Sequence, residues 1–106
     1  SQLRIRVSEA RNLPALDWGG TSDPYVIARF EGQTKKTSTI FKTLHPRWNE
    51  ILVFPTSSST MDTSLGIECF DHDFGSKDDS CGRVDIDLLG FSVGETVCKW
   101  YPLKDY

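Results

Sequence analysis

The feature that most constrains the fold of this chain is the regular spacing of its turn and loop signals, which recur about every 8–12 residues. Between these signals apolar and polar residues alternate, as in Leu3-Arg4-Ile5-Arg6-Val7, which is typical of a strand with one buried face. No stretch has the period of an amphipathic helix. We therefore predict an all-β fold with seven strands, at residues 3–7, 25–30, 36–41, 48–54, 65–70, 84–88 and 96–103.

Two tryptophans, Trp48 and Trp100, fall within these strand patterns and are predicted to be core residues. The run 56–60 is predicted to be a serine- and threonine-rich loop.

The length of 106 residues allows a single domain, 1–106, with one hydrophobic core. The chain opens on Ser1, so we expect it to be excised from a larger protein. A net charge of −3 argues against a nucleic-acid binder, which would need a basic face. No apolar run approaches the roughly 20 residues that span a bilayer.

The three cysteines, Cys69, Cys81 and Cys98, are an odd number without close pairing. This pattern favours reduced thiols and a cytoplasmic setting over a disulfide framework.

The order of the connections along the chain, which we call the parity argument, predicts that three of them lie at the same end of the domain. If successive strands are antiparallel, the connections alternate between the two ends of the domain. The loop at 17–23, the turn at 43–46 and the loop at 71–80 are the first, third and fifth connections. All three are therefore expected at one end.

Six carboxylates gather in two of these loops, namely Asp17, Asp23, Asp71, Asp73, Asp78 and Asp79. Unpaired, they would repel one another and destabilise the fold, and a multivalent hard cation would reverse that effect. Calcium suits long irregular loops because it accepts six to eight oxygen ligands in flexible geometry. Magnesium demands tight octahedral geometry, and zinc would need ligands that His45 and His72, far apart, do not provide.

The alternative for an acidic run is a solvated surface. We prefer that interpretation for Asp78, and for Asp85 and Asp87 on the outer face of their strand.

Three segments resemble, in the right order, the characteristic parts of a C2 domain. Residues 13–26, LPALDWGGTSDPYV, look like its first calcium-binding loop. Residues 42–50, KTLHPRWNE, resemble its middle segment, and residues 70–79, FDHDFGSKDD, its third calcium loop. The resemblance covers nearly the whole chain.

This resemblance implies an antiparallel Greek-key β-sandwich of eight strands, which binds phospholipid with two or three calcium ions, as in synaptotagmin and protein kinase C. The carboxylate ligands that it implies are Asp17, Asp23, Asp71, Asp73 and Asp79, of which all but Asp79 would bridge ions. It also implies ligands from the backbone oxygens of Leu16, His72 and Lys77 and from the Ser76 hydroxyl.

Calcium would then act as an electrostatic switch. The five ligand aspartates carry a formal charge of −5 at the loop end of the domain. The rest of the chain has 10 acidic and 12 basic residues, and so a formal charge of +2. Neutralising the tip would let it approach an anionic membrane. Trp18 and Phe74 each follow a ligand aspartate and are expected to insert at the lipid interface, although packing onto the loops is the alternative.

A basic patch for anionic lipid is a weaker candidate. Arg29, Lys35 and Lys36 lie where some C2 domains carry a lysine-rich patch, but Ile27 and Ser38 stand where those members have lysine. A solvated face is an equal alternative.

The sequence gives no sign of an enzyme, since it has no nucleophile elbow, Gly-rich phosphate loop or paired Asp-Thr/Ser-Gly turns. We expect calcium-dependent binding to anionic phospholipid membranes and a peripheral location in the cytoplasm. A calcium-regulated protein-interaction module is the alternative. Because one strand of the expected eight is missing, an exposed sheet edge could also support a strand-exchanged dimer.

Overall fold

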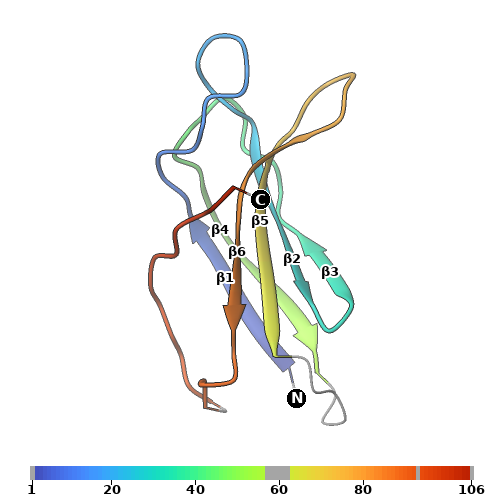
Figure 1. The fold of residues 1–106 in the computed structure, drawn as a ribbon, viewed down its shortest axis with the longest axis vertical. Helices are drawn as coiled ribbons and strands as arrows, with labels where there is room; N and C mark the ends of the chain where they lie inside the picture. The colour runs from blue at the N-terminus through green and yellow to red at the C-terminus, as the bar shows by residue number, and fades with distance from the viewer. Residues whose placement is uncertain (1, 57–62, 93, 106) are drawn as a thin grey trace.

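Alternating side chains along the strands produce two antiparallel sheets that pack face to face (Figure 1). The computed structural model describes residues 2–56, 63–92 and 94–105, so the loop predicted at 56–60 lies, apart from Thr56, outside it. The described residues form six strands: β1 (Gln2–Glu9), β2 (Pro24–Phe30), β3 (Gln33–Lys36), β4 (Arg47–Pro55), β5 (Ser64–Asp71) and β6 (Asp79–Asp87).

One sheet consists of β1 and β4, and the other has the order β3-β2-β5-β6. Every paired strand is antiparallel to its neighbour. The all-β antiparallel sandwich predicted from the sequence is therefore confirmed. None of the described residues forms a helix long and apolar enough to cross a bilayer.

The core between the sheets consists of two clusters. The one nearer the loops contains Leu13, Val26, Trp48, Cys69 and Cys81, which confirms the prediction for Trp48. The other contains Ala28, Phe30, Leu52, Phe54 and Leu65. On β2 the buried residues Val26, Ala28 and Phe30 face inward, so Tyr25, Ile27 and Arg29 lie on the outer face.

The three acidic or turn-forming connections do lie at one end, as the parity argument predicts. In Figure 1 the β1–β2, β3–β4 and β5–β6 connections all stand at the upper end. Backbone hydrogen bonds join them, because Thr43 N–H donates to Ser22 O at 2.9 Å and His72 N–H donates to Asp23 O at 2.9 Å. This end of the domain is thus a set of loops joined to one another by backbone hydrogen bonds.

The third strand is shifted from its predicted position. It covers Gln33–Lys36 rather than 36–41. At Thr37 the side-chain hydroxyl accepts the Val26 N–H at 2.9 Å, so the regular backbone ladder ends there. The residues up to 46 form a connection instead.

The predicted seventh strand, 96–103, is wrong. Residues 96–103, all of them described, form no strand, and the chain pairs with β6 just beyond them, in an isolated bridge in which Arg83 and Lys104 exchange two backbone hydrogen bonds of 2.8 Å. A regular antiparallel ladder would need the next donor at position 102, and Pro102 has no N–H. Trp100, predicted to be buried, is 58% exposed, with the Arg11 guanidinium 4.5 Å from its ring centre.

We expect Phe54→Ala to destabilise the fold by about 3–5 kcal/mol, because its ring is completely buried between the sheets. Urea unfolding followed by tryptophan fluorescence measures this. Val53→Ala on the same strand is the control and should cost less than about 1 kcal/mol, since Val53 is exposed. Equal losses for the two variants would contradict the assignment of the inner face of β4.

Candidate metal centre

The first loop is held in shape by a buried serine. The Ser22 hydroxyl donates to Pro14 O at 2.8 Å and accepts the Leu16 N–H at 3.1 Å. Asp17 N–H donates to Thr21 O at 2.9 Å, which closes the tip of the loop. These bonds fix the backbone on both sides of Asp17, so its carboxylate is directed toward the end of β5.

Asp23 connects all three loops. Its N–H donates to Asp71 Oδ1 at 2.8 Å, and its own Oδ1 accepts the Lys42 N–H at 2.7 Å. Its carbonyl accepts the His72 N–H. Lys42 has a positive φ of 57°, which an L-residue adopts at a cost, and the hydrogen bond to Asp23 holds it there. The loops therefore form one unit around Asp23 and Asp71.

The centre of this unit is a cluster of three carboxylates. One oxygen from each of Asp17, Asp71 and Asp73 lies within 4.8 Å of the others. Asp71 is fully buried, and its Oδ2 has no hydrogen-bond partner among the described residues. A buried carboxylate oxygen without a partner is costly, and a bound cation would satisfy it.

The carboxylates also disturb one another electrostatically. Burial and the nearby carboxylates of Asp71 and Asp23 raise the pKa of Asp17 to about 6. The pKa of Asp73 is raised as well, by burial and by Asp71 and Asp79. The cluster thus holds more negative charge than the fold alone compensates, and its donors are all hard oxygens. This donor set fits calcium.

The other predicted ligands lie around this cluster. Asp79 is the first residue of β6 and the Cα partner of Asp71, while Asp23 borders the cluster through its bond to Asp71. The His72 ring is turned toward Asp78, with 3.6 Å between Nδ1 and Oδ1, and the ligand predicted for this residue is its backbone oxygen. The remaining three predicted ligands are exposed and lie in the same two loops: Leu16, Ser76 and Lys77.

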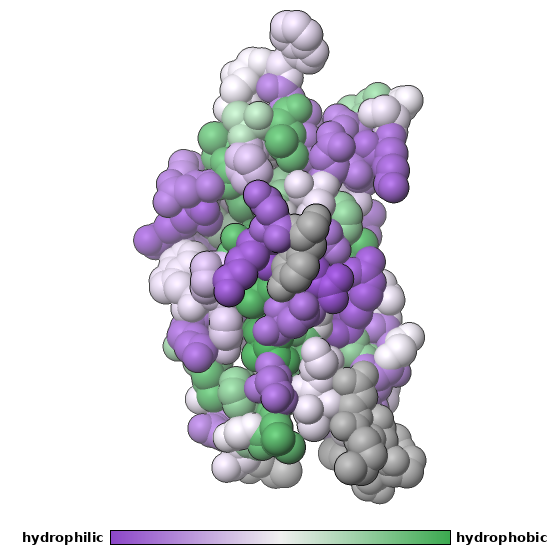
Figure 2. Space-filling view, viewed as in Figure 1, coloured by the Kyte–Doolittle hydropathy of each residue, from purple (hydrophilic) through white to green (hydrophobic). Residues whose placement is uncertain are grey.

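A hollow of about 670 Å³ opens at the carboxylates between the first and third loops. It is lined by Asp17, Trp18, Gly19, Thr21, Asp23, Lys42, Asp73 and Phe74. In Figure 2 the β5–β6 connection, at the upper right, is green and white at its tip and purple, that is hydrophilic, below the tip. The hollow therefore combines acidic walls with an aromatic rim.

Next to the two aromatic residues that line the hollow lies a third, Phe41, which sequence reasoning missed. Trp18 is fully exposed and Phe74 is 77% exposed. Phe41, 55% exposed, stacks on Phe74 with 6.2 Å between ring centres, and the His72 ring meets Phe74 edge-on at 4.7 Å. Phe41 was hidden in the strand wrongly predicted at 36–41. Its place beside the turn at the acidic end was the signal that could have found it.

The interpretation of Asp78 as a solvated side chain is wrong. Its Oδ2 accepts the Tyr25 hydroxyl, and its Oδ1 accepts the Asp73 N–H at 2.9 Å. These bonds lower the pKa of Asp78. Asp85 and Asp87 are exposed as predicted, Asp85 in an ion pair with Arg83 at 2.9 Å.

The three residues of the candidate basic patch do not share one face. Lys36 pairs with Ile27 and lies on the outer face, whereas Lys35 pairs with the inward-facing Ala28. The Lys36 ammonium lies 4.3 Å from the Tyr25 ring centre, and Arg29 is 3.6 Å from Glu68. The structure therefore does not bring these residues together as one basic surface.

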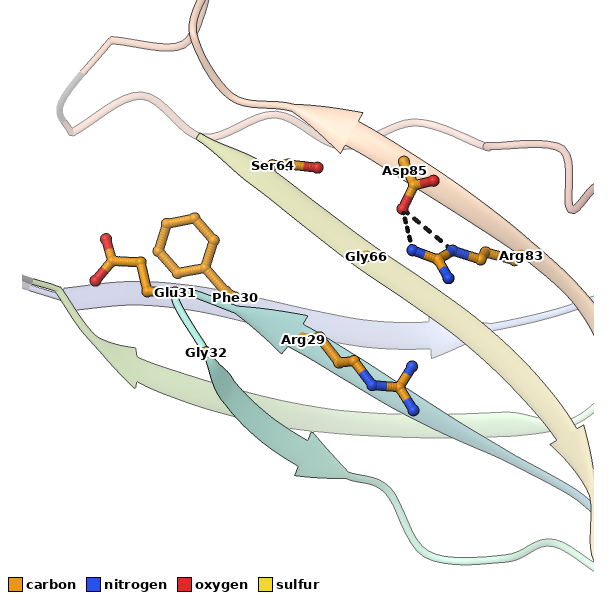
Figure 3. A pocket seen from close by; sticks show the side chains of 8 residues that line it. All are labelled: Arg29, Phe30, Glu31, Gly32, Ser64, Gly66, Arg83 and Asp85. Atoms are coloured by element: carbon orange, nitrogen blue, oxygen red, sulfur yellow. Dashed lines mark hydrogen bonds and ion pairs between the residues drawn. The ribbon is translucent and has the colours of Figure 1, made fainter. Parts of the chain in front are cut away.

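Arg29 instead borders a smaller hollow of about 190 Å³ on the outer face of the four-stranded sheet (Figure 3). Gly66 on β5 leaves its floor uncovered, and Arg83 on the neighbouring strand is bonded to Asp85. Glu31 lines it too. Since its acidic and basic residues balance, it has no strong preference for an anion.

Comparison with known proteins gives a consistent result. The family model for the C2 domain matches residues 1–103. Ras GTPase-activating protein 4B from Homo sapiens is 39% identical over 103 residues, covering 97% of this chain and 13% of that protein. Synaptotagmin 1 from Drosophila melanogaster is 37% identical over 108 residues, covering 97% of this chain and 23% of that protein. The chain thus spans less than a quarter of these relatives.

A solved structure of the paired C2 domains of Extended-Synaptotagmin 2, described as calcium bound, is also similar. It superimposes with a TM-score of 0.85 at 32% identity, covering 96% of this chain and 39% of that one.

We expect the protein in chelator to become more stable as pH falls from 7 to 5. The folded state binds protons more tightly than the unfolded state wherever a carboxyl pKa is raised above 3.8, as it is for Asp17. Asp17→Asn should remove most of this gain and stabilise the chelated protein at pH 7. Thermal unfolding at several pH values measures both effects, and an unchanged pH dependence in Asp17→Asn would contradict them.

Proposed function

This chain belongs to the C2 domain family, and we propose that it binds calcium at the acidic cluster and thereby docks on membranes rich in anionic phospholipid. Membrane and lipid binding is a general property of this family. The dependence on calcium is the specific part of the proposal.

Calcium binding is supported above all by the buried Asp71 Oδ2, which lies next to the carboxylates of Asp17 and Asp73 and has no hydrogen-bond partner in the part of the chain that the structure describes. A divalent cation at that point would remove both the desolvation cost and the mutual repulsion. The similar solved structure described as calcium bound is consistent with this proposal.

The ligand set that we propose extends beyond the cluster. Asp23 and Asp79 would add carboxylate oxygens, and the backbone oxygens of Leu16, His72 and Lys77 would complete the coordination of two or three ions. The Ser76 hydroxyl would serve the outermost ion. Calcium accepts such irregular oxygen shells, whereas magnesium would leave several of these groups unused.

Membrane docking follows from the change of charge at the tip. Loading with calcium neutralises the five aspartates, while the rest of the chain carries an excess of two basic residues. An anionic surface then no longer repels the tip, and lipid oxygens can complete the open coordination sites. The sandwich itself need not rearrange.

The apolar contribution comes from the rim of the hollow. Trp18, Phe41 and Phe74 belong to three different loops at the same end, and all are exposed. Exposed aromatic rings at such a rim suit the lipid interface, where Trp in particular is favoured.

Within a longer protein this domain would serve as a non-catalytic targeting module that associates peripherally with the cytoplasmic face of a membrane. The activity in the name of the Ras GTPase-activating relative belongs to a protein of which this chain covers 13%. A strand-exchanged dimer is not supported by the structure of the single chain.

Asp71→Asn tests the proposal. We expect the wild-type protein to sediment with phosphatidylserine vesicles in calcium but not in chelator, and Asp71→Asn to lose at least about 90% of this binding. The asparagine keeps an oxygen for the Asp23 N–H but removes the charge that faces the cation. Asp105→Asn, outside the loops, is the matched control and should bind normally. Equal sedimentation with and without calcium would refute the switch. Calcium binding without sedimentation would favour the protein-interaction module.

The rim residues allow a second test. We expect Trp18→Ala, Phe41→Ala and Phe74→Ala each to weaken vesicle binding about 5- to 30-fold, because each removes about 1–2 kcal/mol of interfacial burial. Calcium affinity without vesicles should change less than about 2-fold. Trp100→Ala is the control, since that exposed tryptophan lies in the C-terminal segment. Normal vesicle binding by all three rim variants would rule out insertion.

A further inference from the structure

A hydrogen-bonded brace ties the third loop to the outer face of the sheet. Asp78 is its centre, because one carboxylate oxygen accepts the Tyr25 hydroxyl and the other accepts the Asp73 N–H. Asp78 itself is not part of the carboxylate cluster. Its position in the loop therefore calls for an explanation other than ligation.

The Tyr25 end of the brace is rigid. Tyr25 lies on β2, is only 5% exposed and stacks on Phe70 of the neighbouring β5, with 5.6 Å between ring centres. The Lys36 ammonium covers the ring from β3. Three strands thus fix the position of the phenol hydroxyl.

The Asp73 end, in contrast, has little other support. Residues 74–77 are all exposed, and Gly75 has a positive φ of 84°. Only the Phe74 ring makes aromatic contacts, to Phe41 and His72. Without the bond to Asp78, repulsion from the neighbouring carboxylates would drive Asp73 away from the cluster.

We propose that Tyr25 and Asp78 are positioning residues for the cation site, which hold Asp73 beside Asp17 and Asp71 before calcium arrives. This inference rests on the proposed calcium function. Because the loop is already ordered, less conformational entropy is lost when the ion binds, and affinity is higher. By linkage, bound calcium stabilises the brace to the same extent.

Tyr25→Phe is the decisive variant, since it breaks the brace without altering charge or touching a ligand. We expect calorimetry on the whole chain to show that the variant binds calcium about 10-fold more weakly. This is the lower end of the loss of metal affinity that follows when a residue that orients a metal ligand is replaced. Tyr101→Phe, on the C-terminal segment, is the matched control and should bind as the wild type does. Urea unfolding in chelator measures stability separately, and a merely structural role would lower that stability while leaving calcium affinity unchanged.

Asp78 variants separate bonding from charge. Asp78→Asn can still accept the Asp73 N–H and can donate to the Tyr25 oxygen, so it should bind calcium more tightly than Asp78→Ala. The double variant Tyr25→Phe/Asp78→Ala should bind calcium no more weakly than Asp78→Ala alone, because Asp78→Ala already removes the whole brace and Tyr25→Phe then has nothing further to break.

Additive losses, or wild-type affinity in Tyr25→Phe, would overturn the brace while leaving the proposed calcium function intact. A wild-type chain that binds no calcium would overturn both.

Discussion

The loops at one end of this domain are arranged around the buried carboxylate of Asp71, whose charge the surrounding groups must compensate. It sits without exposure at the end of β5, where one oxygen is paired with a backbone N–H and the other has no partner among the described residues. Such a group opposes folding unless its surroundings compensate. The fold places two further carboxylates beside it instead of a lysine or arginine. The fold therefore concentrates negative charge at a buried point, and the proposed cation site rests on this concentration of charge.

The loops that surround the carboxylate cluster have less conformational freedom than their length implies. Asp23 holds the first, second and third loops together through its N–H, its carboxylate and its carbonyl. Ser22 fixes the first loop from within, and Tyr25 and Asp78 fix the third from the side. The candidate site thus lies on loops whose backbones are restrained by hydrogen bonds to one another and to the sandwich, which is the usual relation between a scaffold and the loops that it supports.

Much of this could be predicted from the sequence because it depends on local pattern. Alternation gave most of the strands, and parity alone placed the acidic loops at one end. What failed depends on tertiary detail. Pro102 can be read in the sequence, but its missing N–H matters only because Lys104 pairs with the distant Arg83. The Thr37 hydroxyl ends β3 early through its hydrogen bond to the Val26 N–H of β2. The role of Asp78 could not be foreseen because its partner, Tyr25, is distant in the chain. Likewise, the pairing of β3 with β2 decides which of the neighbouring residues Lys35 and Lys36 lies on the outer face of the sheet.

The contact between Leu103 and Gly82 has a consequence for self-association of this domain through its sheet edges. A Cβ at position 82 would lie only 2.9 Å from that of Leu103, so the glycine lets the C-terminal segment lie directly against β6. β6 is the last strand of its sheet, and exposed edges invite aggregation by β-pairing. The opposite edge, β3, carries Lys35 and Lys36. One edge of the four-stranded sheet is thus covered by the C-terminal segment and the other carries charge, so both edges are protected against pairing with a strand of another chain.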